Sequence, residues 1–182
     1  MNKKKVMVYG VKGERLNKLS THIRDNNFDI KIINNDEIDN IVDDLVNDKI
    51  DLQKSDNWAD MEFLLFVNIK DDLLYDFLAK LREDKLLFPH KAILTETNRK
   101  WKLRKLLKEN KEEHAIMTIY GNLRRAIITA EKLLSQGNKD RELEIYLDKA
   151  RDYISPREFD YDELKGVYND LAVRVNFLLK GE

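Results

Sequence analysis

The chain of 182 residues contains no cysteine, only two prolines and only six glycines. The absence of cysteine excludes disulfides, thiolate zinc sites and a cysteine nucleophile. The low proline and glycine content excludes a collagen-like or proline-rich disordered chain. The 33 basic and 34 acidic residues leave a net charge of −1. This balance argues against binding of nucleic acid or membranes through overall charge.

Long hydrophobic runs are also missing. The first apolar run, Val6 to Tyr9, is too short for the core of a signal peptide. The strongest run, Phe63 to Val67, is far below the ~20 residues that span a bilayer. We therefore expect a cytoplasmic protein without membrane contact. Its 42% hydrophobic and 37% charged residues predict a packed core beneath a highly charged surface.

Residues 1–116 alternate between two periodicities, which is typical of an α/β domain. Apolar runs predict strands, and helical spacing of apolar residues predicts a helix after each strand. The expected strands cover residues 6–9, 28–33, 63–67 and 92–94, and the expected helices begin at residues 13, 36 and 71 and after residues 95–98. We expect a four-stranded, mostly parallel, doubly wound sheet with the strand order 2-1-3-4.

A weak internal repeat relates the two halves of this region. A shift of 58 residues aligns Lys12 with Lys70, Leu16 with Leu74 and Arg24 with Arg82, as three examples. We interpret the region as two similar βαβα halves that share one sheet.

Residues 117–182 carry no strand pattern. Three amphipathic stretches, from residues 123 to 134, 143 to 154 and 164 to 178, predict an all-α unit of three helices. We therefore expect two domains, residues 1–116 and 117–182. The helical unit is expected to form a homodimer or to bind a protein partner.

The turn after the first strand is a candidate ligand site. Gly10 and Gly13 let backbone amides approach a phosphate, and Lys12 and Arg15 lie beside them. The turn lacks the Walker and the dinucleotide-binding fingerprints. Tight turns between strand and helix also need glycine, and this structural interpretation is favoured.

A second polar cluster follows the fourth strand. Thr95, Thr97 and Asn98 precede Trp101, at the edge where open α/β sheets bind ligands. These side chains are suited to a small anionic or hydroxylated ligand. The favoured alternative is that Thr97 or Asn98 caps a helix and that Trp101 belongs to the core.

Charge is unevenly distributed along the chain. Residues 36–62 contain ten acids and two lysines, whereas residues 91–111 contain eight bases and two acids. The basic side chains from Arg99 to Lys108 suggest a phosphate-binding helix, which makes nucleic-acid binding a third hypothesis. The favoured interpretation is a solvated helix face that complements the acidic segment within or between subunits.

No set of catalytic residues is evident. None of the three histidines has a second histidine three or four residues away, so we expect no metal site and no cofactor. No serine has the G-x-S-x-G context of a hydrolase. Glu14 and Glu96 are the only general-base candidates near the two polar turns.

Several segments together resemble a known family. They are Val8-Tyr9-Gly10, Gly13 to Leu19, Glu62 to Phe66, Pro89 to Asn98 with Trp101, and Glu113-His114. Across residues 3–117 they resemble a bacterial family of small proteins described only as a domain of unknown function. The resemblance implies no activity, substrate or cofactor. It implies only that the Gly13-Glu14-Arg15 turn and the segment from Thr95 to Trp101 recur.

We therefore expect a non-enzymatic binding or regulatory module. In this hypothesis the two polar turns converge at one sheet edge and bind a small polar or anionic ligand, while the C-terminal helices dock a protein. The alternative is an enzyme that acts on phosphorylated or nucleotide-like small molecules, with Lys12 and Arg15 as phosphate clamps.

Overall fold

The computed structural model of the chain describes residues 3–52, 61–154 and 160–180. They belong to two compact units, residues 1–111 and residues 112–182. The division falls inside a helix, α4 (Leu103–Ser135), which contributes its first turns to one unit and the remainder to the other.

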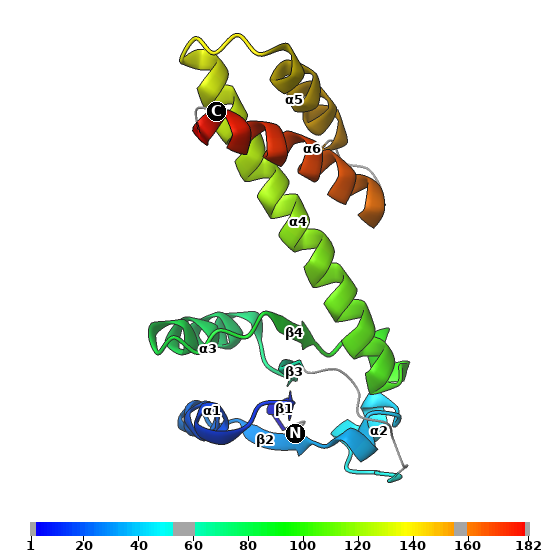
Figure 1. Cartoon of the computed structure of the whole chain (residues 1–182). Coiled ribbons are helices and arrows are strands. Elements are labelled where there is room, and N and C mark those ends of the chain that lie inside the picture. Colours follow the sequence, from blue (N-terminus) through cyan, green and yellow to red (C-terminus); the bar gives the residue numbers. More distant parts are fainter. Residues whose placement is uncertain (1–2, 53–60, 155–159, 181–182) are drawn as a thin grey trace. The chain divides into compact units, whose positions relative to one another are not determined.

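The first unit is built on a four-stranded sheet with the order β2-β1-β3-β4 (Figure 1). Its strands are β1 (Lys5–Tyr9), β2 (Asp29–Ile33), β3 (Phe63–Val67) and β4 (His90–Ile93). The pairs β1–β2 and β3–β4 are parallel, whereas the central pair β1–β3 is antiparallel. The predicted α/β class and strand order are therefore confirmed, and the sheet is mixed although mostly parallel.

The connection between β2 and β3 explains the reversed direction of β3. After β2 the chain forms the 3-10 helix η1 (Asn35–Glu37) and then α2 (Val42–Val46), which is shorter than the predicted helix. The turn after α2 brings Asp48 to Lys5, at the start of β1. Before β3, Met61 already lies against Gly10, at the other end of β1. Asp48 and Met61 thus lie at opposite ends of β1, and β3 starts beside the end of β1.

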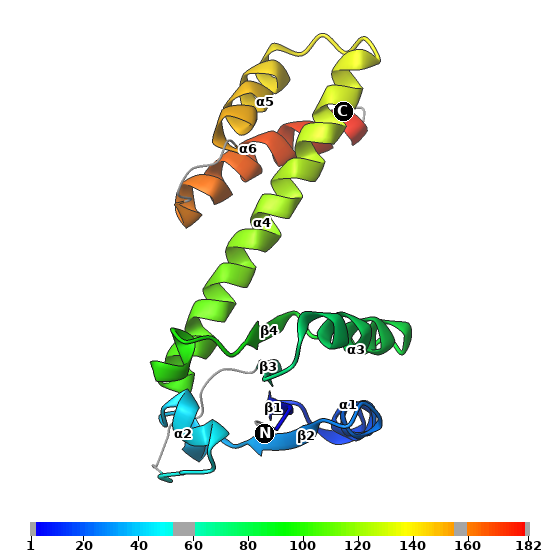
Figure 2. The ribbon, with the colours of Figure 1, turned by 180° about the vertical axis from the view of Figure 1, so that it is seen from behind.

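Helices cover both faces of the sheet (Figure 2). Helices α1 (Gly13–Asp25) and α3 (Asp71–Glu83) pack on one face, against Val6, Val8, Leu64 and Phe66. Helix α2 and the first turns of α4 pack on the other face, against Met7, Tyr9, Phe63 and Leu65. Because neighbouring residues of a strand point to opposite faces, the central strands are apolar over residues 6–9 and 63–67.

Strand β4 lies at one edge of the sheet, and two of its carbonyls are occupied by side-chain amides. Asn110 Nδ2 donates to the carbonyl of Lys91 at 3.0 Å, and Asn98 Nδ2 donates to the carbonyl of Ile93 at 2.9 Å. Both asparagines follow β4 in sequence, so the chain itself closes these positions.

Helix α4 is continuous where the sequence predicted two separate helices. A 3-10 turn, η2 (Asn98–Lys100), precedes it, and α4 then runs for 33 residues. No proline interrupts this stretch, and Gly121 is its only glycine. Residues between the two predicted helices are mostly strong helix formers, so the helix persists without an apolar stripe there.

The second unit consists of the remainder of α4 with α5 (Arg141–Tyr153) and α6 (Tyr161–Lys180). The predicted helical C-terminal region is confirmed. Asp140 caps α5 by accepting a hydrogen bond from the Leu143 amide at 2.7 Å. Among the residues that the structure describes, no helix is long and apolar enough to cross a bilayer.

Candidate functional site

The two polar turns lie at opposite edges of the sheet. Tyr9, at the end of β1, is opposite Phe63 at the start of β3, whereas β4 runs parallel to β3. The turn after β1 and the segment after β4 are therefore separated by the length of a five-residue strand, roughly 15 Å. The prediction that they form one pocket is wrong, because it assumed that β1 and β4 end at the same edge of the sheet, whereas β3 and β4 run opposite to β1.

The turn after β1 has structural roles. A Cβ on Gly10 would lie 2.0 Å from the carbonyl oxygen of Met61, and the φ of Gly10 is +73°. Gly13 also has a positive φ, +57°, but open space surrounds it. Lys12 is exposed, and its side chain makes no capping hydrogen bond to α1. Glycine at position 10 is thus required by the close approach of the segment that enters β3.

Arg15 ties three parts of the first unit together. Its Nε and Nη2 atoms donate to the two carboxylate oxygens of Glu62, at 2.9 and 2.7 Å. Nη2 also donates to the carbonyl of Leu87, and the guanidinium lies 4.9 Å from the centre of the Phe88 ring. The hydrogen bond to Glu62 raises the pKa of the guanidinium. These contacts fix Arg15 to the segments that enter β3 and β4, and its side chain stays 41% exposed.

The segment after β4 is folded around Asn98. The buried Asn98 side chain accepts from the Thr95 amide at 2.8 Å, and the Asn98 amide donates to Thr95 Oγ1 at 3.1 Å. Thr97 is exposed and makes no capping hydrogen bond. Trp101 packs against the core of the second sheet face, with Lys105 Nζ 4.3 Å from its ring centre. Thr95, Asn98 and Trp101 thus hold the local fold.

The acidic and basic segments pair with each other within the chain. Arg104 donates to both carboxylate oxygens of Asp39, and Arg99 lies 3.1 Å from Asp43. The Leu103 amide also donates to the carbonyl of Asn40 at 3.0 Å. For these two arginines, the interpretation as a face that complements the acidic segment is confirmed. Their engagement weakens the hypothesis of a nucleic-acid-binding helix.

The two general-base candidates also lie in ion pairs. Glu14 contacts Lys18 at 2.7 Å, and this hydrogen bond lowers the pKa of Glu14. Glu96 contacts Arg99 at 2.7 Å. A carboxylate with a lowered pKa is a poor proton acceptor at neutral pH.

A hollow of about 890 Å³ lies at the sheet edge where β3 and β4 end and β1 begins. Its volume is in the range of pockets that bind small molecules. It is lined by Lys3, Lys5, Ile41, Asp43, Asp44, Val46, Asn47, Asp48, Val67, Asn68, Leu94, Arg99 and Lys100. This set, named the β3/β4-edge hollow below, includes neighbours of the predicted Thr95–Trp101 cluster but neither Thr95 nor Thr97.

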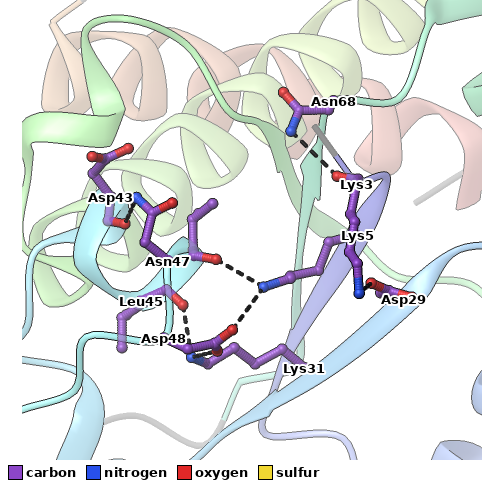
Figure 3. Close-up of polar contacts among 10 residues, drawn as sticks. Lys3, Lys5, Asp29, Lys31, Asp43, Leu45, Asn47, Asp48 and Asn68 are labelled. Carbon is purple, nitrogen blue, oxygen red and sulfur yellow. Dashed lines mark hydrogen bonds and ion pairs between the residues drawn. The ribbon is translucent and has the colours of Figure 1, made fainter. Parts of the chain in front are cut away.

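Two almost buried lysines contact Asp48 (Figure 3); Lys5 and Asp48 line the hollow, whereas Lys31 is not among its lining residues. Lys5 Nζ donates to the carbonyl of Val46 at 2.8 Å and lies 3.4 Å from Asp48. Lys31 Nζ donates to the carbonyl of Leu45 and to Asp48, both at 2.6 Å. Their side chains are 13% and 11% exposed. Two ammonium groups therefore share one carboxylate.

The two lysines lower the pKa of Asp48. The hydrogen bond from Lys31 is the main cause that lowers the pKa of Asp48, with Lys5 contributing less. The carbonyls of Leu45 and Val46, at the end of α2, supply the remaining acceptors. Sequence reasoning missed this cluster, although charged residues within two otherwise apolar strands were a visible signal.

The hollow is also lined by exposed polar groups. Lys3 is 79% exposed in its side chain and lies 3.5 Å from Asp29. Asn68 Nδ2 donates to the carbonyl of Lys3 at 3.3 Å, and Lys100 is exposed. Among residues 3–52, 61–154 and 160–180, no group of three histidines or acids is placed to hold a metal.

A family model described as a domain of unknown function (DUF3783) matches residues 62–117. No curated protein and no solved structure gives a significant match. The matched segment covers β3, α3, β4, η2 and the first turns of α4, and it includes the Thr95–Trp101 cluster but not the turn after β1. The resemblance to a domain of unknown function is therefore confirmed for this segment.

Proposed function

We propose that the chain is a cytoplasmic, non-enzymatic binding module whose β3/β4-edge hollow holds a small anion, and whose C-terminal helices dock a protein. The observation that supports the anion site is that Lys5 and Lys31 share the carboxylate of Asp48. Lys5 and Lys31 are almost buried, and among the residues that the structure describes Asp48 is their only charged partner. An incompletely compensated positive charge at low exposure favours the binding of an anion.

Other lining residues of the hollow supply further attraction for an anion. Lys3 and Lys100 are exposed cations, and Asn68 adds an amide. Asp43 is already paired with Arg99, which leaves Asp44 as the main repulsive group. A compact anion such as phosphate or a short dicarboxylate fits this distribution of charge.

Calorimetric titration of the full chain with inorganic phosphate, and separately with succinate, tests the ligand. We expect heat of binding for at least one anion, and a Tm that rises by several °C when its concentration is about 100 times the Kd. The double variant Lys3→Gln/Lys100→Gln should lose most of this response.

The matched control is Lys12→Gln/Lys70→Gln, which removes two exposed lysines that do not line the hollow. This control should keep the wild-type response. Equal loss in both double variants would indicate non-specific screening of charge. Selective loss in the control would instead place the anion outside the hollow, and no response in wild-type protein would remove the proposed ligand.

We also propose that the first unit contains two similar βαβα halves of a doubly wound sheet. Strand β1 begins at Lys5 and β3 at Phe63, and α1 begins at Gly13 and α3 at Asp71, so both offsets are 58 residues. The same offset relates Met7 to Leu65, the middle pair of the central ladder. It also relates the left-handed residues that follow α1 and α3, Asn27 and Lys85.

A further inference from the structure

Two exposed helix faces of the second unit carry complementary sequences. We infer that the face of α4 that contains Met117, Gly121, Arg124, Arg125, Ile128 and Lys132 binds the face of α6 that contains Asp162, Glu163, Gly166, Asp170, Val173 and Phe177 in a second copy of this chain. This inference rests on the docking role proposed for the helices and names the partner. The two faces are called the α4 stripe and the α6 stripe.

Both stripes expose large apolar side chains. Met117 and Ile128 on α4 are 57% and 65% exposed, and Val173 and Phe177 on α6 are 69% and 46% exposed. Within each helix these residues are separated by 11 and 4 positions, which places them on one face. The core-facing residues of the same helices are different, for example Leu123 on α4. Each stripe is therefore an additional apolar face that the fold of one chain does not bury.

Each stripe also contains a glycine within the helix. Gly121 and Gly166 lie inside α4 and α6, and a Cβ at either position would meet nothing within 4 Å. Glycine is unfavourable inside a helix, and no packing in the chain requires it at these two positions. A second helix that approaches closely gives both glycines a role.

An antiparallel arrangement of the two stripes matches apolar groups to the glycines. When Met117 of one copy lies opposite Phe177 of the other, the shared helical spacing places Gly121 opposite Val173 and Ile128 opposite Gly166. Large side chains then face the two positions that lack one. A small hollow of about 290 Å³ beside Val173 and Phe177 is available for the flexible Met117 side chain.

The same register pairs opposite charges. Arg124 and Arg125 fall opposite Asp170, and Lys132 falls opposite Asp162 and Glu163. All of these side chains are exposed. Lys132 and Asp170 form no ion pair with another residue in the part of the chain that the structure describes.

Opposite charges therefore flank the apolar contacts at several positions. In a parallel arrangement with Met117 opposite Asp162, Lys132 would lie opposite Phe177, away from the acidic start of α6. The charges thus select the antiparallel direction.

The contact joins the α4 stripe of one copy to the α6 stripe of another, so the two copies use different surfaces. Such a contact is heterologous, and it links copies head to tail unless a rotation closes the assembly. We therefore expect a mass above the 21.6 kDa of one chain. Because charges contribute, high salt should reduce association.

Sedimentation velocity of the full chain over a range of concentrations tests the inference. Arg124→Glu/Arg125→Glu/Lys132→Glu reverses the α4 stripe, and Asp162→Lys/Glu163→Lys/Asp170→Lys reverses the α6 stripe. Each variant alone should sediment as a monomer. An equimolar mixture should associate again, because each reversed stripe then meets a complementary one. Lys149→Glu, on the exposed face of α5, is the control and should behave as wild type.

A wild-type chain that stays monomeric at every concentration overturns the inference. So does a mixture of the two variants that remains monomeric, or association that persists in both variants separately. Circular dichroism of each variant shows whether the helices are intact. The anion titration of the β3/β4-edge hollow is repeated on both variants, so that failure of self-association is distinguished from failure of the proposed ligand site.

Discussion

The guanidinium of Arg104 donates two hydrogen bonds to the carboxylate of Asp39, at 2.8 Å from Nε and 2.7 Å from Nη2. The two residues are separated by 65 positions in sequence. Their side chains are 31% and 20% exposed, so water only partly screens the pair. This contact joins the acidic connection after β2 to the basic start of α4.

Asp39→Ala is expected to lower the free energy of unfolding by about 1–2 kcal/mol, because it leaves a half-buried guanidinium without its bidentate partner. Urea unfolding followed by circular dichroism measures the change. Glu96→Ala is the control, because the Glu96 side chain is 84% exposed in its pair with Arg99. It should change stability much less. Equal effects of the two substitutions would contradict a special role for the Arg104–Asp39 pair.

Gly10→Ala should destabilise the first unit by several kcal/mol, because the new Cβ would meet the Met61 carbonyl at a site with positive φ. Gly13→Ala has the same backbone strain but open space around it, so a loss of about 1 kcal/mol is expected. Comparing the Tm of the two variants separates the cost of the contact with Met61 from the cost of the backbone conformation. If Gly10→Ala were no worse than Gly13→Ala, the close approach of Met61 would not limit this position.

Lys85→Gly should stabilise the chain by about 0.5–1 kcal/mol, because Lys85 follows α3 with a φ of +58°. Asn27→Gly, at the equivalent place after α1 with a φ of +56°, should act in the same direction but less, since asparagine tolerates this conformation. Chemical denaturation measures the change in the free energy of unfolding for both variants. Opposite signs at the two sites would weigh against the proposal of two similar halves.

Acid should weaken the second unit through Asp140. The hydrogen bond from Arg174 is the main cause that lowers the pKa of Asp140, and the Leu143 amide adds to it. The stabilisation is complete above the ordinary aspartate pKa of about 3.9 and is lost as pH falls through the lowered folded-state value. Urea unfolding between about pH 5 and pH 2 should therefore show falling stability.

Asp140→Asn removes this ionisation, so its stability should be lower than wild type at neutral pH and depend less on pH below about 4. The same decline in wild type and variant would assign the acid sensitivity to other carboxylates. Asp48, whose pKa is also lowered, provides the corresponding test in the first unit with Asp48→Asn.

The local pattern of apolar residues was sufficient to predict much of the secondary structure of the first unit. The apolar run from Phe63 to Val67 coincides with β3, and the helix expected from residue 71 coincides with the start of α3. Strand direction was not predictable in this way. An apolar run shows that both faces of a strand are covered, but it carries no information on which way the chain enters the sheet.

The direction of β3 depends on the connection that follows β2, and the later part of its sequence, residues 49–60, has little periodicity. This connection placed the two polar turns at opposite edges and so removed the expected common pocket. The β3/β4-edge hollow was missed for a related reason. Lys5 and Lys31 come from different strands, and only the tertiary position of Asp48 brings them together.

The amides of Asn98 and Asn110 have a consequence for solubility. An edge strand usually offers unpaired carbonyls to the edge of another sheet, and this is a common route to aggregation. At Lys91 and Ile93 these carbonyls already accept hydrogen bonds from the same chain. Substituting either asparagine by leucine would therefore leave one of these carbonyls unpaired and open to pairing with the edge strand of another sheet.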